Sequence, residues 1–373
     1  MDDLRRGYLE QIRRGGVTLT PELAAAFAGV PREAFVPDGF RRRNDGGWVR
    51  PGDDDFRSIV YQDDVLVTKV NGKIPVSSSS QPSLMALMIE ALDVRPGRRI
   101  LEIGAGTGYN AALLATLGAS VTSVDVQEDV ADRARSALAE ARIEGVRVVS
   151  GDGYAGFPGG RFDRVIVTVG IAGLSPRWLD QLAPDGLIVA PVDHAGMHPV
   201  LAARRPARPG SLADPAGPLT ATMVCHAGFM TAAGPLTADH PGAFPAPAAA
   251  RELGELTEVE PARFADPHEP IPYRDLWYAA GVWHRRASHA AVPGVQQSCL
   301  AFLDEDRKGG AVVLADGRVL AAGPEAERYG AEAGAVVDRW VAAGRPAMRD
   351  WRVGFGLTGD PEAPIWVPDE FSI

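Results

Sequence analysis

The segment RILEIGAGTGYN, residues 99–110, decides the fold that we predict for this chain. Its first five residues form a short apolar run typical of a strand, and the glycines after them mark a tight turn before a helix. Glycines let the backbone approach a bound nucleotide, and the helix N-terminus leaves unpaired N–H groups facing it. The spacing is G-x-G-x-G, and Tyr109 stands where a dinucleotide-binding turn needs its third glycine. The turn therefore favours a methyl-donor nucleoside over a dinucleotide, with a purely structural glycine turn as a third alternative.

Strands and helices alternate along the chain around this turn. We expect strands over 99–103, 121–126, 146–149, 162–169 and 187–192, and helices over 84–92, 111–117, 129–142 and 176–182. This alternation is typical of α/β proteins with a parallel, doubly wound sheet. The predicted fold class is α/β, a doubly wound Rossmann-like methyltransferase domain with a smaller C-terminal α+β domain.

The rest of the chain divides by composition. We predict an N-terminal helical segment and loop over 1–60, the methyltransferase domain over 61–198, a Pro/Gly-rich connecting region over 199–250, and a C-terminal substrate-recognition domain over 251–373. Thr20-Pro21 predicts a helix start, because a capping side chain precedes a first-turn proline. In the C-terminal part we expect helices over 276–284 and 326–343, a hairpin around Asp316-Gly317, and strands over 351–357 and 365–367.

Charge and composition exclude several classes of protein. The formal net charge of −10 over 373 residues disfavours nucleic acid as a partner, because binding phosphates needs a basic surface. Cys225 and Cys299 are the only cysteines, which argues against a disulfide framework. No apolar run approaches the roughly 18 residues of a membrane span, so we expect a cytoplasmic protein with no membrane partner. The histidines lack metal-binding spacing, and no metal is expected.

Acidic residues follow the two strands next to the Gly-rich turn. Asp125 closes the strand over 121–126, where a carboxylate can accept hydrogen bonds from both ribose hydroxyls of a nucleoside. Asp152, between two glycines, follows the strand over 146–149 and would meet the adenine edge. A surface or helix-capping role is the alternative for each. Because the carboxyl ends of parallel strands bind ligands together, the set is more specific than either residue alone.

Several motifs resemble those of the protein-L-isoaspartate (D-aspartate) O-methyltransferases over roughly residues 20–195. They are VPREAFVP (30–37), YQD (61–63), SQP (80–82), the Gly-rich turn, GDGYAG (151–156), FDRVIVT (162–168) and QLAPDG (181–186). The resemblance implies S-adenosyl-L-methionine as cofactor and an aspartyl peptide or protein as substrate. It implies that Ser80 lies beside both, with Ser79, Gln81 and Thr168 on the substrate side. It also implies a cofactor site formed by Ser80, Glu102, Gly104, Gly106, Gly108, Asn110, Asp125, Val126, Asp152 and Gly153.

The chain also departs from that family. The repair enzymes usually read T-I-S-x-P where this chain has four serines, Ser77 to Ser80, and a long tail follows the catalytic domain. These features resemble the methyltransferases found with ATP-grasp maturases of ribosomally made peptides, the graspetides. Because Ser80 precedes Gln81-Pro82 at a predicted helix start, it could equally be a helix cap.

The expected chemistry follows from the substrate. An aspartate carboxylate titrates near ~3.9, so it is ionised near neutral pH and can attack the methyl group without a general base. Ser80 would orient the carboxylate by a hydrogen bond. The resemblance implies that the resulting methyl ester can close to an aspartimide.

Three hypotheses remain. The first is a tailoring enzyme that methylates an aspartate of a modified precursor peptide, with the tail shaping a groove beside Ser80. The second is a repair enzyme that acts on isoaspartate in damaged proteins. The third is a non-catalytic cofactor-binding interaction protein. The added tail favours the first, since a repair enzyme must accept many sequences.

Overall fold

The computed structural model of this protein describes residues 3–42, 46–204, 219–237, 251–253, 255–293, 295, 298–304 and 309–373. The predicted connecting region 199–250 therefore lies partly outside the described residues. Within the described residues, no helix is both long and apolar enough to cross a membrane.

The centre of the fold is a twisted sheet with a parallel half. Its parallel strands lie in the order β9-β8-β5-β6-β7. They are β5 (Arg99–Ile103), β6 (Ser120–Asp125), β7 (Val146–Ser150), β8 (Phe162–Val167) and β9 (Leu182–Pro191). Helices α4 (Pro82–Leu92), α5 (Tyr109–Thr116), α6 (Glu128–Glu140) and α7 (Pro176–Gln181) connect and cover them. The predicted doubly wound α/β fold is confirmed, and each predicted element in this part exists.

Four antiparallel strands extend the sheet beyond β9. They are β10 (Val200–Arg204), β11 (Thr220–Cys225), β18 (Arg352–Thr358) and β19 (Ile365–Ser372), in that order. We predicted two strands at the C-terminal end but assigned them to a separate domain. In the structure they pair through β11 with the central sheet, so the end of the chain belongs to the catalytic half.

The N-terminal part packs against the helices α4, α5 and α6. It contains α1 (Asp3–Arg14), α2 (Pro21–Gly29), the 3-10 helix η1 (Arg32–Phe35), α3 (Phe56–Val60) and a small sheet in the order β2-β1-β3-β4. Thr20 caps α2 as predicted, since its Oγ1 accepts from the N–H of Leu23 at 3.3 Å. The edge-to-face rings of Tyr8 and Phe27 and the contact of Phe27 with Tyr109 tie this region to α5.

The small sheet ends in a hairpin that the sequence analysis did not predict. Its strands are β3 (Leu66–Asn71) and β4 (Ile74–Ser79), and β1 (Phe40–Arg41) and β2 (Trp48–Val49) complete the sheet. A helix cap was the alternative given for Ser80. Ser77, Ser78 and Ser79 lie in β4, and Gln81 rather than Ser80 is the N-cap residue of α4.

A C-terminal unit folds around a second sheet, whose described strands are ordered β12-β14-β15-β16-β17-β13. We use this name for β12 (Arg251–Glu252), β13 (Thr257–Glu260), α8 (Pro270–Trp283), β14 (Ala287–Ala291), β15 (Cys299–Leu303), β16 (Gly310–Val313), β17 (Val319–Ala322) and α9 (Ala326–Ala342). The hairpin predicted around Asp316-Gly317 is the antiparallel pair β16–β17. Helices α8 and α9 were also predicted, although α8 begins earlier than expected.

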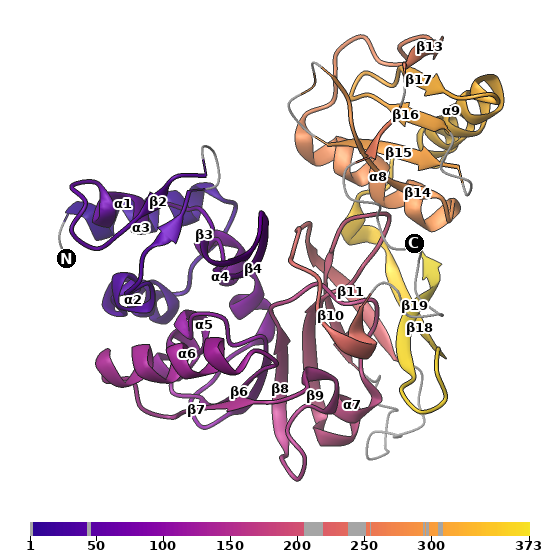
Figure 1. Ribbon diagram of the computed structural model, residues 1–373. Helices are drawn as coiled ribbons and strands as arrows, with labels where there is room; N and C mark the ends of the chain where they lie inside the picture. The colour runs from indigo at the N-terminus through magenta and orange to yellow at the C-terminus, as the bar shows by residue number, and fades with distance from the viewer. Residues whose placement is uncertain are drawn as a thin grey trace.

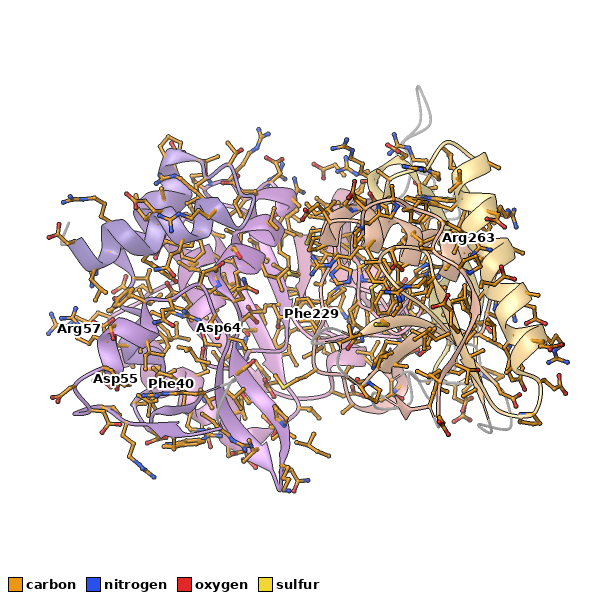
Figure 2. All side chains as sticks on the ribbon, turned by 90° about the horizontal axis from the view of Figure 1, so that it is seen from above. Phe40, Asp55, Arg57, Asp64, Phe229 and Arg263 are labelled. Atoms are coloured by element: carbon orange, nitrogen blue, oxygen red, sulfur yellow. The ribbon has the colours of Figure 1, made fainter. Side chains whose placement is uncertain are left out.

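The C-terminal unit contacts the catalytic half through the turn between β9 and β10. Trp277 of α8 donates its indole N–H to the carbonyl of Ala195 at 2.9 Å, and the ring of His194 stacks at 4.4 Å from that of Tyr278. Figure 1 shows the unit beside β10 and β11, away from the N-terminal elements. In Figure 2, Phe229 lies between Asp64 of the N-terminal part and Arg263 of the C-terminal unit.

Candidate active site

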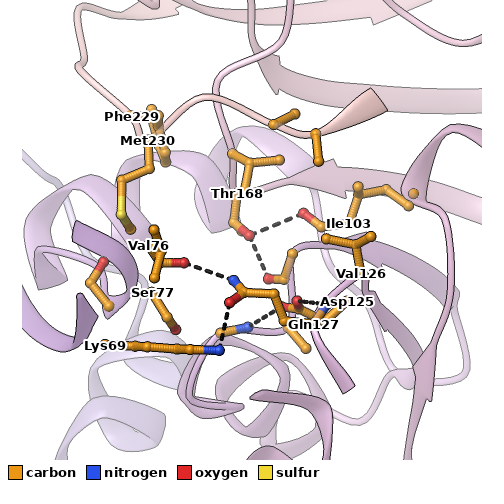
Figure 3. Close-up of a pocket in the computed structure, with 18 of the residues that line it drawn as sticks. Lys69, Val76, Ser77, Ile103, Asp125, Val126, Gln127, Thr168, Phe229 and Met230 are labelled. Carbon is orange, nitrogen blue, oxygen red and sulfur yellow. Dashed lines mark hydrogen bonds between the residues drawn. The ribbon is translucent and has the colours of Figure 1, made fainter. Parts of the chain in front are cut away.

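A cavity of about 1080 Å³ opens at the carboxyl ends of β5, β6 and β8. Five groups of residues line it: the hairpin β3–β4 with Ser80, the Gly-rich turn, the residues after β6, β7 and β8, the segment 229–236 that follows β11, and Met85, Tyr109 and Asn110 at the helices α4 and α5. Figure 3 labels members of the hairpin, of the residues after β6 and β8, and of the segment 229–236, including Ser77, Val126, Thr168 and Met230. No described residue of the C-terminal unit lines this cavity. Of the tail that follows the catalytic domain, the described residues that line the cavity with Ser80 belong to the segment 229–236.

The glycines of the turn are required by close contacts within the protein. Gly104 and Gly106 have φ of +97° and +53°, which side-chain-bearing residues rarely adopt. A Cβ on Gly104 would lie 2.6 Å from Oγ1 of Thr168, and one on Gly106 would lie 3.1 Å from the carbonyl of Ser78 in β4. Both glycines line the cavity, whereas Gly108 packs against Ala134 of α6 and does not.

Asp125 lies at the cavity wall with both carboxylate oxygens engaged. One oxygen accepts from the N–H of Gly106 and the other from the N–H of Gln127, each at 3.0 Å. Burial raises the pKa of Asp125 above its ordinary value, while hydrogen bonds from the backbone N–H groups lower it. Val126 follows with 56% of its surface exposed, and it also lines the cavity.

Glu102 lies behind the wall instead of in it. Its side chain is fully buried and does not line the cavity. It accepts from Nδ2 of Asn110 at 2.7 Å and from the hydroxyl of Ser123. Burial raises the pKa of Glu102 to about 7. We therefore revise the expectation of direct cofactor contact: Glu102 orients Asn110, which does line the cavity.

The serines of β4 line the opposite wall. Ser79 is 2% exposed, and its hydroxyl has no hydrogen-bond partner among the described residues. Ser80 is half-buried, and its carbonyl accepts from Arg32, a fully buried side chain, at 3.0 Å. Both serines line the cavity, but Gln81 does not. Gln81 donates to the carboxylate of Asp63 at 3.0 Å.

The remaining predicted residues lie at the ends of β7 and β8. Asp152 is exposed and accepts from the N–H of Tyr154 at 2.9 Å, so it caps a 3-10 turn while lining the cavity beside Gly153. Thr168 also lines the cavity, and its hydroxyl donates to the carbonyl of Gly104 at 2.6 Å. Thr168 therefore supports the Gly-rich turn and also lines the cavity.

Sequence reasoning missed two contributors to the cavity. The segment 229–236 reaches it because Gly170 after β8 donates to the carbonyl of Met230 at 2.8 Å and accepts from the N–H of Ala232 at 2.8 Å. Lys69 and Gln127 meet across the cavity edge at 2.8 Å. Neither contribution has a local motif, since both depend on contacts between residues far apart in the chain.

Among the residues that the structure describes, His, Cys, Asp and Glu side chains form no group able to hold a metal ion. His194 and His198 are buried near the turn between β9 and β10, and burial lowers the pKa of each to about 4.

A Gly-rich turn with G-x-G-x-G spacing after the first parallel strand, and a carboxylate closing the next strand beside it, are typical of Rossmann-like methyltransferases. A dinucleotide-binding turn would have its third glycine where this chain has Tyr109. Known proteins agree. Residues 50–210 match the family described as Protein-L-isoaspartate(D-aspartate) O-methyltransferase (PCMT). A protein named protein-L-isoaspartate O-methyltransferase 2 from Rhodopseudomonas palustris (strain HaA2) is 48% identical over 182 residues, which cover 48% of this chain and 74% of that protein.

Two further comparisons extend this result. A protein-L-isoaspartate O-methyltransferase of Gloeobacter violaceus is 38% identical over 187 residues, covering 49% of this chain and 79% of the relative. A solved structure with the same name has a TM-score of 0.53 and 23% identity, and covers 98% of this chain and 100% of its own, which shows a shared fold. This chain belongs to the protein-L-isoaspartate O-methyltransferase family. It is accordingly a carboxyl O-methyltransferase that uses S-adenosyl-L-methionine, as predicted.

Proposed function

We propose that this chain methylates the free carboxylate of L-isoaspartyl residues in proteins and peptides, with S-adenosyl-L-methionine as methyl donor. The observation that carries the proposal is the shared cavity. One wall of it holds the Gly-rich turn and Asp125, and the opposite wall holds Ser79 and Ser80. This pairing of walls suits a nucleoside on one side and a carboxylate on the other, and the named relatives support the choice of substrate.

Residues of both walls fit bound polar ligands. Asp125 is held in place by two backbone N–H groups, which leaves it fixed as an acceptor for ribose hydroxyls. The side-chain carbonyl oxygen of Asn110 and the hydroxyl of Ser79 are buried without partners among the described residues, and both residues line the cavity. Buried polar atoms usually have partners, so these two atoms fit a bound polar ligand.

The reaction does not require the protein to remove a proton from the substrate. The bound donor supplies an electrophilic methyl group, and the substrate carboxylate is already ionised, so no general base is needed. The protein has to hold the carboxylate in line with the methyl group and exclude water from it. Ser79 and Ser80 are the candidates to hold the carboxylate by hydrogen bonds from their hydroxyl groups.

The repair hypothesis has more support than the tailoring hypothesis. We favoured tailoring because the tail could form a dedicated peptide groove, but the cavity contains no described residue of the C-terminal unit. The solved structure that covers 98% of this chain carries the name protein-L-isoaspartate O-methyltransferase, so an added unit is compatible with that fold. Methylation of a precursor peptide and closure to an aspartimide remain predictions.

A pair of peptides with one sequence tests the proposal. One contains L-isoaspartate and the other the ordinary aspartate, and purified full-length chain is given each with the methyl donor. We expect a methyl ester on the isoaspartyl peptide alone. It is detected as a mass increase of one CH₂ and by the methanol that the ester releases in base. Asp125→Ala should weaken donor binding by about tenfold or more, since hydrogen bonds to a charged group contribute roughly 1.5–3 kcal/mol. Equal methylation of the two peptides would contradict the proposal.

A further inference from the structure

The two walls of the cavity are joined by the side chain of one residue, Gln127. Its carboxamide lies between the strands of the hairpin β3–β4: Nε2 donates to the carbonyl of Val76 in β4 at 2.8 Å, and Oε1 accepts from the ammonium of Lys69 in β3 at 2.8 Å. Figure 3 shows both hydrogen bonds at the cavity edge. Lys69 and Gln127 both line the cavity. The carboxamide thus holds both strands of the hairpin.

The backbone of Gln127 belongs to the other wall. Its N–H donates to Asp125 at 3.0 Å, and the same carboxylate accepts from the N–H of Gly106 at 3.0 Å. The path from β4 to the Gly-rich turn therefore runs through the Gln127 side chain, the Gln127 backbone and the Asp125 carboxylate. Gly106 closes this path, because the Ser78 carbonyl of β4 approaches the position of its absent Cβ to 3.1 Å.

Lys69 orients the carboxamide. Its ammonium also reaches the carboxylate of Asp129, in the first turn of α6, at 2.7 Å. The two side chains of this ion pair are 30% and 57% exposed, so the pair itself contributes little to stability. What Lys69 supplies is a cation on the oxygen side of the Gln127 carboxamide, which directs the nitrogen side towards Val76.

We propose that Gln127, oriented by Lys69, is a positioning residue that couples two parts of the cavity. One is the donor wall, formed by the Gly-rich turn and Asp125, and the other is the serine strand β4. Occupancy of the donor site beside Asp125 fixes Gln127, and Gln127 then fixes β4 with its serines for the substrate carboxylate. This inference deepens the proposed function and rests on it. In this inference, Lys69 and Gln127 contact neither the methyl group of the donor nor the carboxylate of the substrate. Their effect therefore lies in the coupling between donor binding and substrate binding.

Hydrogen exchange tests the donor half of this coupling without any substrate. S-adenosyl-L-homocysteine is added to the full-length chain, and exchange is followed for peptic fragments that span 66–79. We expect slower exchange of the hairpin in the wild type and loss of that slowing in Lys69→Met. Lys73→Met is the matched control, because Lys73 is an exposed lysine in the turn of the same hairpin. It should retain the wild-type response. Equal slowing in Lys69→Met, or none in the wild type, would overturn the inference.

Gln127→Glu and Asp129→Asn separate the two partners of Lys69. Gln127→Glu keeps an oxygen for Lys69 but sets a carboxylate against the Val76 carbonyl, so the hairpin response should be lost. Asp129→Asn removes the ion pair and leaves the carboxamide in place, so the response should persist. A loss in Asp129→Asn with retention in Gln127→Glu would show that the ion pair acts alone and would refute the assignment of Gln127.

Substrate affinity provides the second measurement. The Kd of an isoaspartyl peptide is measured with and without S-adenosyl-L-homocysteine, and we expect the homocysteine form to improve it by about fivefold or more in the wild type. In Lys69→Met this ratio should fall towards one. Variants that lose affinity equally with and without the homocysteine form would show a merely structural hairpin and overturn the inference. A wild type that protects the hairpin but does not methylate isoaspartyl peptides would instead refute the proposed function alone, because the donor coupling would still be present.

Discussion

The hairpin β3–β4 and the C-terminal unit both lie outside the doubly wound sheet, yet they relate to the cavity in opposite ways. The hairpin is short, and most of its residues line the cavity. The C-terminal unit has its own sheet, two helices and an apolar core that includes Leu276, Phe302 and Trp340. None of its described residues lines the cavity.

The difference shows that the size of an added region does not predict its role at the site. The hairpin lies directly at the cavity, where Gln127 donates to the carbonyl of Val76 and Gly106 leaves room for the carbonyl of Ser78. Among the described residues, the C-terminal unit is linked to the cavity through intermediate residues. His198, in the turn that the unit contacts, accepts from the N–H of Phe229 at 3.2 Å, and Phe229 lines the cavity. We expect the hairpin to determine turnover and the unit to have small effects on it.

Gly106→Val should have the largest effect, because it breaks the contact between the hairpin and the turn. Valine is strained at a φ of +53°, and its Cβ would meet the Ser78 carbonyl at 3.1 Å. Strain of this kind costs on the order of 1–3 kcal/mol before any clash. We expect donor affinity and kcat/KM each to fall by about 100-fold, measured by calorimetry and by methyl transfer. A folded variant with unchanged donor affinity would mean that the hairpin does not close on the turn.

A pH titration of Glu102→Gln examines the support behind the donor wall. Burial raises the pKa of Glu102 from 4.5 to about 7, so the folded state favours the protonated form. The stabilisation is present below about pH 4.5 and is lost as the pH rises through about 7. Glutamine stays neutral and can keep both hydrogen bonds.

As the pH rises from about 4.5 to about 7, the unfolding free energy of the wild type should therefore fall by roughly 3 kcal/mol relative to that of Glu102→Gln. Urea unfolding at several pH values measures this difference. Parallel pH profiles of the two proteins would show that Glu102 titrates normally in the fold.

Ser79→Ala and Ser80→Ala examine the hairpin's own contribution to the reaction. One hydrogen bond to a charged acceptor contributes roughly 1.5–3 kcal/mol, so loss of the hydroxyl that holds the carboxylate should lower kcat/KM by about tenfold or more. Donor affinity should stay within a few-fold. Ser58→Ala, on the exposed face of α3, is the matched control. If donor affinity falls and turnover of bound donor does not, the serines belong to the donor wall.

Local patterns in the sequence predicted the part of the cavity wall that holds the Gly-rich turn and Asp125. The Gly-rich turn could be predicted because its glycines form a motif of consecutive residues. Asp125 could be predicted because it closes the next predicted strand. The serine strand could not, because serine favours turns, and only pairing with β3 holds Ser77 to Ser79 extended. The strand β18 was predicted as an element, but its partner β11 lies far away in the sequence. Which sheet a strand joins depends on such distant pairing, and the hydrophobic periodicity of the strand does not predict its partner.

Exposed substitutions on the C-terminal unit should have the smallest effect of all. Arg328 in α9 and Arg318 before β17 are 56% and 42% exposed, and both form surface ion pairs of the kind worth about 0–1 kcal/mol. For Arg328→Ser and Arg318→Ser we expect kcat/KM within about twofold of the wild type on two isoaspartyl peptides of unrelated sequence. Met230→Ala, in the cavity lining, serves as the positive reference and should lower kcat/KM more than either. Because a repair enzyme must accept many sequences, equal behaviour on both peptides fits that function. A drop on one peptide and not on the other would mean that the C-terminal unit reads substrate sequence after all, and it would restore the tailoring hypothesis.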